Sequence, residues 1–282
     1  MSRWNSASRT ALVALVGASL AIGCRKPAVN DEPDEDVTIA EDGSDATAAE
    51  TDAQLITSSL VSASPGPIGL ATTDLTESDL GTSDIGDGAK AIYFPRTCLQ
   101  VVADSATRTA TYTFDRCMGP NGLRGVTGEV KARYESSSGG LHLELTATDL
   151  AVNRATMDWA ATADITTSDA RRTMTWKAQL SGTTARGRAF ERTSEHTITW
   201  ALGEACFGLE GSSEGTVNGR QIRTEVTGFR RCRRECPDAG GKIVVTNVTK
   251  NVRYELHYDG TNRATLIGPN GGEHSVPLLC SQ

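Results

Sequence analysis

Hydrophobic and polar residues alternate one by one through most of the chain. In the segment VTGEVKARYES, Val126, Val130 and Tyr134 fall on one side of an extended backbone. Lys131 and Arg133 fall on the other side. A strand with this pattern faces a core with one side and water with the other. The same alternation recurs in LHLELTATDL, TMDWAATADI, TMTWKAQL, EHTITWAL, GRQIRTEVTGF and VRYELHYD.

Turn-forming residues separate these extended segments at short intervals. The segments are rich in Thr, Val, Tyr and Trp, which suit a half-buried pleated surface. The spacing predicts an all-β domain over residues 90–282, an antiparallel meander of about a dozen strands rather than βαβ units. The pattern leaves open whether the strands form a twisted sheet, a sandwich or a barrel. The turns are marked by Asn121-Gly122, Gly139-Gly140, Asn218-Gly219, Asp259-Gly260 and Asn270-Gly271.

The start of the chain has the pattern of a secretory signal. Two arginines precede an apolar run over Thr10–Gly23, which at about 14 residues is shorter than the roughly 20 that span a bilayer. Cys24 follows Ala21-Ile22-Gly23 directly, and this junction resembles a bacterial lipobox. The resemblance implies that residues 1–23 are a lipoprotein signal peptide and that Cys24 becomes a lipidated N-terminus. The alternative is an ordinary signal peptide with an incidental cysteine.

Acidic residues dominate the segment that follows. Residues 27–89 hold 15 Asp or Glu and no Lys or Arg, whereas residues 90–282 hold 24 basic and 20 acidic residues. A composition this acidic and poor in aromatics predicts a disordered linker over residues 24–53. Leu55, Ile56, Leu60 and Val61 approximate a helical stripe, so residues 54–89 are expected to be a short helix and a loop that lead into the β domain.

Six cysteines remain once Cys24 is set aside as the lipid anchor. An even number in an exported chain indicates disulfides. The first two flank one expected hairpin, and the next two are centred on the turn at Asn218-Gly219. A metal site is not expected, because the CxxxC spacing lacks a second pair or a nearby histidine. The predicted pairs are Cys98–Cys117, Cys206–Cys232 and Cys236–Cys280, with an exchange of partners between Cys232 and Cys236 as the alternative.

Three segments carry a family resemblance: AIYFPRTC, YTFDRCMGPNGLRGVTGEVKARYESSSGGLHLELTATDLAVNRATMDWAATADI and ITWALGEACFGLEGSSEGTVNGRQIRTEVTGFRRCRRECPDAGGKI. They resemble a group of uncharacterised secreted lipoproteins from myxobacteria and related bacteria. The resemblance covers about residues 91–280, with cysteines, turn glycines and strands in one order. It implies a lipid-anchored, disulfide-stapled β domain and implies no activity.

The sequence contains no phosphate-binding loop and no HExxH, and its four histidines are scattered. No cofactor is therefore expected. The most concentrated feature is the run Arg230-Arg231-Cys232-Arg233-Arg234, whose four arginines are a candidate anion-binding site. The alternative is that these arginines pair with the acidic linker or with Glu235 and Asp238.

These features predict a lipid-anchored cell-envelope protein, at the outer membrane on its periplasmic side or at the cell surface. We expect it to be a noncatalytic binding or structural module for an anionic envelope glycan or a protein. Nucleic acid is not favoured, because the chain carries a net charge of −7 and no aromatic residues interleave the arginines. The alternatives are a polysaccharide hydrolase with cross-strand carboxylates and a carrier of an apolar ligand.

Overall fold

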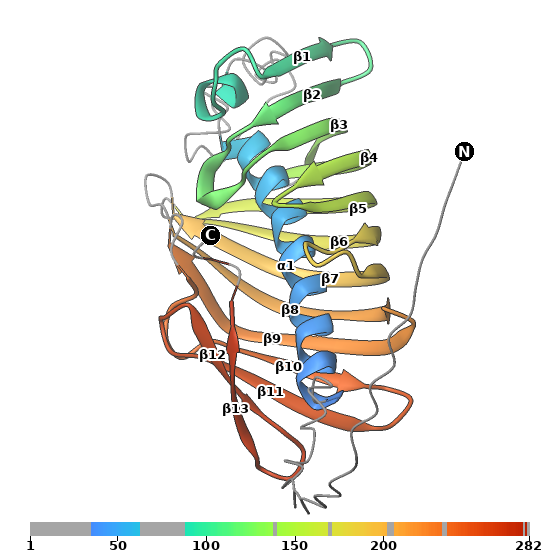
Figure 1. Ribbon diagram of the computed structural model, residues 1–282. Helices are drawn as coiled ribbons and strands as arrows, with labels where there is room; N and C mark the ends of the chain where they lie inside the picture. The colour runs from blue at the N-terminus through green and yellow to red at the C-terminus, as the bar shows by residue number, and fades with distance from the viewer. Residues whose placement is uncertain are drawn as a thin grey trace, which may run out of the picture. The chain divides into compact units, whose positions relative to one another are not determined.

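A single curved antiparallel sheet makes up most of the molecule (Figure 1). The computed structural model describes residues 35–62, 88–137, 140–168, 171–201, 206–232, 236–278 and 280. Within these residues, thirteen strands pair in sequence order from β1 to β13, and a 28-residue helix, α1, precedes them. The helix and strands are α1 (Glu35–Ser62), β1 (Leu99–Asp104), β2 (Thr109–Cys117), the 3-10 turn η3 (Pro120–Gly122), β3 (Val126–Ser137), β4 (Gly140–Val152), β5 (Ala155–Ser168), β6 (Arg171–Thr183), β7 (Ala189–Ala201), β8 (Cys206–Val217), β9 (Arg220–Cys232), β10 (Lys242–Asn247), β11 (Val252–Tyr258), β12 (Arg263–Ile267) and β13 (Glu273–Pro277).

The predicted antiparallel meander is confirmed, and its strands follow the alternation seen in the sequence. In β5, Trp159 and Ala163 are buried, whereas Asp158 and Thr162 are exposed. Ala163 lies opposite Trp176 of β6, and the two tryptophan rings pack edge to face with centroids 6.5 Å apart. In the described part of the chain, β1 and β13 are the two edges of the sheet. The chain therefore adopts the open twisted sheet rather than a sandwich or a closed barrel.

A glycine permits a bulge where the long strands bend. Gly211 of β8 has φ of 138°, and a β-carbon there would lie 2.3 Å from the carbonyl oxygen of Glu195. The register between β8 and β9 shifts at this point. A bulge bends its strand and increases the local twist, which helps the sheet to curve.

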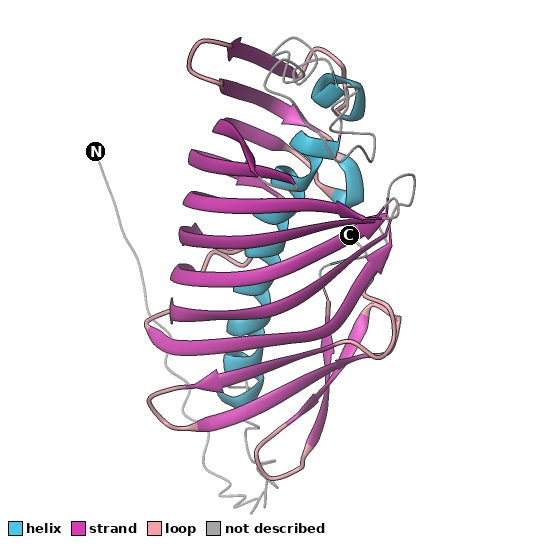
Figure 2. Cartoon of the chain, turned by 180° about the vertical axis from the view of Figure 1, so that it is seen from behind, coloured by secondary structure: helices cyan, strands magenta, loops and turns pink. Residues whose placement is uncertain are grey.

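The concave side of the sheet holds α1, which crosses the strands instead of running along them (Figures 1 and 2). Its apolar side chains are buried in the same cluster as the inward side chains of the strands. Its polar side chains are also buried, including Asp42 and Glu50 at 0% exposure. No helix among the described residues is both long and apolar enough to span a bilayer.

The expectation of a disordered acidic linker as far as residue 53 is wrong for residues 35–53. These residues form the first two thirds of α1, and the short helix expected from Gln54 to Ser62 is its last third. The compositional argument failed because the sheet supplies the counter-charges that the segment lacks. Residues 1–34, with Cys24 and the expected signal peptide, lie outside the described residues, as do residues 63–87.

Ion pairs join α1 to the inner face of β7 and β9. Nε of Arg192 lies 3.2 Å from Oε1 of Glu50, and both side chains are fully buried. Ser213 donates a hydrogen bond of 2.6 Å to the other Glu50 oxygen. At the far end of the helix, Arg172 donates to the carbonyl oxygen of Val61 at 3.0 Å, where a cation also favours the helix dipole.

All three predicted disulfides are confirmed: Cys98–Cys117, Cys206–Cys232 and Cys236–Cys280. The second joins residues that lie opposite each other on β8 and β9. The third ties the loop before β10 to the residues after β13, so the C-terminal end of the sheet is held covalently.

We expect Glu50→Ala to lower the free energy of unfolding by about 3–5 kcal/mol, because it leaves the buried guanidinium of Arg192 without a counter-charge. Urea unfolding of the purified protein measures this. Glu35→Ala is the matched control, since Glu35 pairs with Lys250 at the exposed start of the same helix. The control should leave the midpoint unchanged, and equal effects of the two substitutions would contradict the role given to the buried pair.

Candidate functional site

A cleft of about 690 Å³ lies between α1 and the surrounding parts of the β domain. We call it the α1 cleft. Its walls are the Asp45–Asp52 part of α1, the turns at 121–125 and 151–155, and residues 276–278 at the end of β13. Clefts of this size hold small-molecule ligands in many proteins.

One wall of the α1 cleft carries carboxylates set two helical turns apart. Asp45, Ala48 and Asp52 occupy one face of α1, because residues three, four and seven apart share a face of a helix. The small side chain of Ala48 is exposed and leaves the space between the two acids open. The acids therefore border the cleft without filling it.

Burial raises the pKa of Asp45 to about 6 from an ordinary value of 3.8. The positive charges of Arg186 and Arg188 act against this rise, and Nη1 of Arg186 lies 3.3 Å from Oδ2 of Asp45. The contact is an ion pair without hydrogen-bond geometry, because that oxygen has no hydrogen-bond donor within the described residues.

Burial likewise raises the pKa of Asp52 to about 6. The charge of Arg231 and a 3.0 Å hydrogen bond from Nδ2 of Asn153 oppose the rise. Near neutral pH both cleft acids are thus ionised, and each can take up a proton in mildly acidic surroundings.

The opposite wall combines an arginine with aromatic and aliphatic side chains. Arg231 donates from Nη2 to the carbonyl oxygen of Asn121 at 2.7 Å, and its guanidinium lies 5.3 Å from the centre of the Phe207 ring. Burial lowers the pKa of Arg231. Phe229 and Tyr258 pack edge to face with centroids 5.6 Å apart and also line the cleft. The cleft therefore presents charge and apolar surface together.

The four arginines predicted as one anion site are not brought together as far as the structure describes them. Arg230 and Arg231 are successive residues of β9, so they face opposite sides of the sheet. Arg230 is exposed and lies 3.6 Å from Asp238, whereas Arg231 points into the α1 cleft toward Asp52. Both contacts fit the alternative in which the arginines pair with acids of the same chain. Arg233 and Arg234 lie outside the described residues.

A second polar cluster, which was not predicted from the sequence, lies beneath α1. The hydroxyl of Ser213 lies 3.3 Å from Nε2 of His196, whose Nδ1 lies 2.6 Å from the side-chain amide of Gln54. Burial and the charge of Arg192 lower the pKa of His196 to about 3, so its ring is neutral. Ser213 donates its proton to Glu50 instead of to His196. With every member of this cluster buried, it fixes the helix on the sheet and is closed to a substrate.

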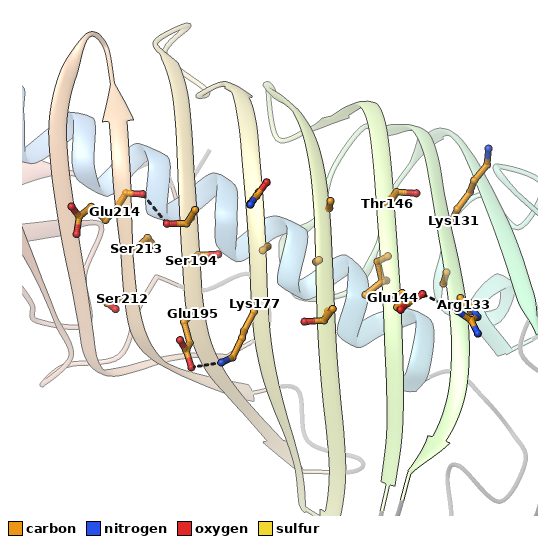
Figure 3. Close-up of a pocket in the computed structure, with 18 of the residues that line it drawn as sticks. Lys131, Arg133, Glu144, Thr146, Lys177, Ser194, Glu195, Ser212, Ser213 and Glu214 are labelled. Carbon is orange, nitrogen blue, oxygen red and sulfur yellow. Dashed lines mark hydrogen bonds and ion pairs between the residues drawn. The ribbon is translucent and has the colours of Figure 1, made fainter.

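The outer face of the sheet carries a broad, shallow groove of about 1130 Å³ across the middle of the long strands (Figure 3). Its charged side chains pair with one another across strands and leave little attraction for an outside ion. Exposed pairs of this kind contribute at most about 1 kcal/mol each. The pairs are Arg133–Glu144 at 3.2 Å, Lys177–Glu195 at 3.0 Å and Arg223–Glu214 at 2.6 Å.

No group of three or more His, Cys, Asp or Glu within the described ranges is arranged to hold a metal ion. Comparison with protein-family models, with curated proteins and with solved structures gives no match for this chain. The geometry of the α1 cleft therefore carries the functional argument.

We expect the raised pKa of Asp52 to make stability depend on pH. A carboxyl whose pKa is higher in the folded state binds more protons when folded, so its contribution to stability is full below about pH 4 and is lost as pH rises through about 6. Asp52→Asn removes that titration while keeping the shape of the side chain. Urea midpoints measured between pH 4.5 and 7.5 should show the wild type losing stability relative to this variant as pH rises. Parallel curves for the two proteins would contradict the assignment.

Proposed function

We propose that this protein is a lipid-anchored cell-envelope module that binds a small ligand in the α1 cleft and catalyses no reaction. The observation that supports the proposal is the cleft itself. It has the volume of a ligand site, and Asp45, Asp52 and Arg231 line it. Burying charged side chains costs free energy, and recognition of a ligand would explain why the cleft contains them.

The envelope location is supported by two independent features. Three disulfides close the β domain, and disulfides persist in exported proteins rather than in the cytosol. The apolar run that ends at Cys24 supplies both an export signal and an anchoring cysteine. The resemblance to secreted myxobacterial lipoproteins points the same way.

The lining of the α1 cleft narrows the class of ligand. Phe229, Ile243 and Leu278 offer apolar contact, while the two acids and Arg231 require polar or charged partners. A purely apolar ligand would desolvate these charged side chains further and offer them no hydrogen bond, which disfavours the apolar-ligand carrier. The ligand that fits has an apolar body and several hydrogen-bonding groups, as a modified sugar or a short glycan fragment has.

A hydrolase is the second candidate, because Asp45 and Asp52 both line the cleft with a raised pKa. Their backbone positions are separated by about 10 Å along the helix, from seven residues at 1.5 Å each. The paired carboxyls of glycosidases lie about 5–9.5 Å apart. Both acids also stand on one wall instead of flanking a bond from two sides. The placement of both acids on one wall favours binding over hydrolysis.

Filling the cleft tests the proposal. We expect Ala48→Trp to occupy the space between the two acids and to exclude the ligand, with little cost to folding because Ala48 is exposed. Native mass spectrometry of the protein purified from its own envelope should show a bound small molecule on the wild type and none on A48W. Ala103→Trp is the matched control, since Ala103 is exposed on β1 away from the cleft, and it should keep the ligand. A wild type without ligand, or equal occupancy of A48W, would overturn the proposal.

The anchor has its own test. We expect Cys24→Ser to move the protein from the membrane pellet to the soluble fraction, because no acyl chain can then be attached. Membrane fractionation followed by intact mass measurement checks this. Retention in the pellet at the wild-type level would rule out lipidation at Cys24 as the anchor.

A further inference from the structure

The acidic side chains of α1 are held by arginines that belong to the sheet. The arginines that form ion pairs here come from the β6–β7 turn and from strands β7 and β9, and the acids that they contact lie between residues 41 and 50 of α1. A guanidinium binds a phosphate through the same paired donors that it offers a carboxylate. The contacts are Glu41 with Arg186 at 3.2 Å and with Arg188 at 3.3 Å, Asp42 with Arg220 at 2.7 Å and with Arg188, and Glu50 with Arg192 at 3.2 Å.

Beneath α1, Arg192 is buried with an anion, the Glu50 carboxylate, as its partner. Arg192 and Glu50 are both at 0% side-chain exposure, so the guanidinium cannot be neutralised by water. A buried charge without a partner costs several kcal/mol. Any other occupant of this space must therefore bring a negative group to Arg192, as Glu50 does.

Around the arginines, the inner face of β6 and β7 carries apolar residues together with the buried polar residues Ser194 and His196. Trp176, Leu180, Phe190 and Ile198 are buried there in one cluster with Leu55 and other residues of α1. An occupant with a hydrocarbon chain would bury against these side chains at about 25 cal/mol for each Å² removed from water. The concave face thus combines an anion site with a surface for an apolar chain, and we call the two together the inner groove.

The helix that fills the inner groove is a weak helix by itself. Its sequence, EDVTIAEDGSDATAAETDAQLITSSLVS, is rich in Thr, Ser and Asp, contains Gly43 and has no basic residue to pair with its acids. These residues favour a helix less than Ala, Leu or Lys do. Released from the sheet, the segment would be a solvated acidic chain with little residual order. Its order therefore depends on the charges of the sheet.

We propose that the inner groove is a binding site for an anionic amphiphile and that α1 is its resident occupant, which the amphiphile displaces. The head group, a phosphate or a carboxylate, takes the place of the Glu50 carboxylate at Arg192 and Ser213, and the chain takes the place of the apolar side chains of α1. This inference goes beyond the α1 cleft, which exists only while the helix is docked.

A disulfide that locks α1 onto the sheet tests the displacement. A β-carbon at Gly43 would lie 2.6 Å from Cγ1 of Val245 on β10, so cysteines at these two positions are placed to cross-link. The staple is Gly43→Cys with Val245→Cys, and its matched control is Gly43→Ser with Val245→Ser, which has the same bulk and cannot cross-link. Both pairs are made in the full chain carrying Cys24→Ser, so that no attached acyl chain competes. Mass measurement confirms the fourth disulfide.

The probes are hexadecyl phosphate, palmitate and hexadecanol, and calorimetric titrations keep the two anionic probes below their micellar concentrations and hexadecanol below its solubility limit. We expect the parent protein and the serine control to bind at least one of the two anionic probes, and the stapled protein to bind it at least tenfold more weakly, because a locked helix removes the binding-competent state. Hexadecanol should bind at least tenfold more weakly than the anionic probe. Preference for phosphate or for carboxylate identifies the head group.

Three outcomes would overturn the proposal: no binding of either anionic probe to the parent protein, equal binding to the stapled protein and its serine control, or equal binding of hexadecanol. The A48W variant separates this site from the α1 cleft. If A48W loses the envelope ligand but binds the anionic probe as the parent does, the two ligands occupy separate sites. The two proposals are then tested independently of each other.

Discussion

The charge match between α1 and the inner face of the sheet is the constraint on which the rest of the structure depends. A meander of this length leaves one apolar face to cover, and α1 covers it although much of the helix is polar. The pairing is possible because inward positions of β7 and β9 carry Arg192 and Arg231 in place of apolar residues. Breaking one pair leaves a buried charge behind, so the helix and the sheet specify each other's position more strongly than apolar packing alone would.

The same charges create the α1 cleft and set its chemistry. Burial desolvates Asp45 and Asp52 more than the nearby arginines compensate, and the pKa of each carboxyl rises. The disulfide between Cys236 and Cys280 holds the C-terminal side of the cleft in place. A rigid sheet therefore supplies one side of the cleft, and a helix whose order depends on charge supplies the other.

The strands and disulfides could be predicted from sequence because their signals are local: alternation gives the strands, and cysteines that flank a hairpin lie opposite each other. The role of residues 35–53 could not be predicted in this way. Composition describes the segment alone, whereas the arginines that pair with its acids lie more than a hundred residues further along the chain. A signal was present in β7, where Arg192, Ser194 and His196 share the inward side with Phe190 and Ile198. Inward polar residues in such a strand require a polar partner. The arginine run failed as one site because neighbours on a strand face opposite ways.

Docking of α1 also changes what the predicted anchor could do. Glu35 lies eleven positions after Cys24, so the chain between them can span at most about 40 Å. A linker that ran to residue 53, as predicted, would have let the β domain range much farther from the bilayer. If Cys24 carries the lipid, the first turn of α1 is held close to the membrane, and any pull on the anchor acts directly on the helix that fills the inner groove. An amphiphile leaving the bilayer would then meet the groove near its source, and the energetic cost of moving α1 would be set by the ion pairs between its carboxylates and the arginines of the sheet.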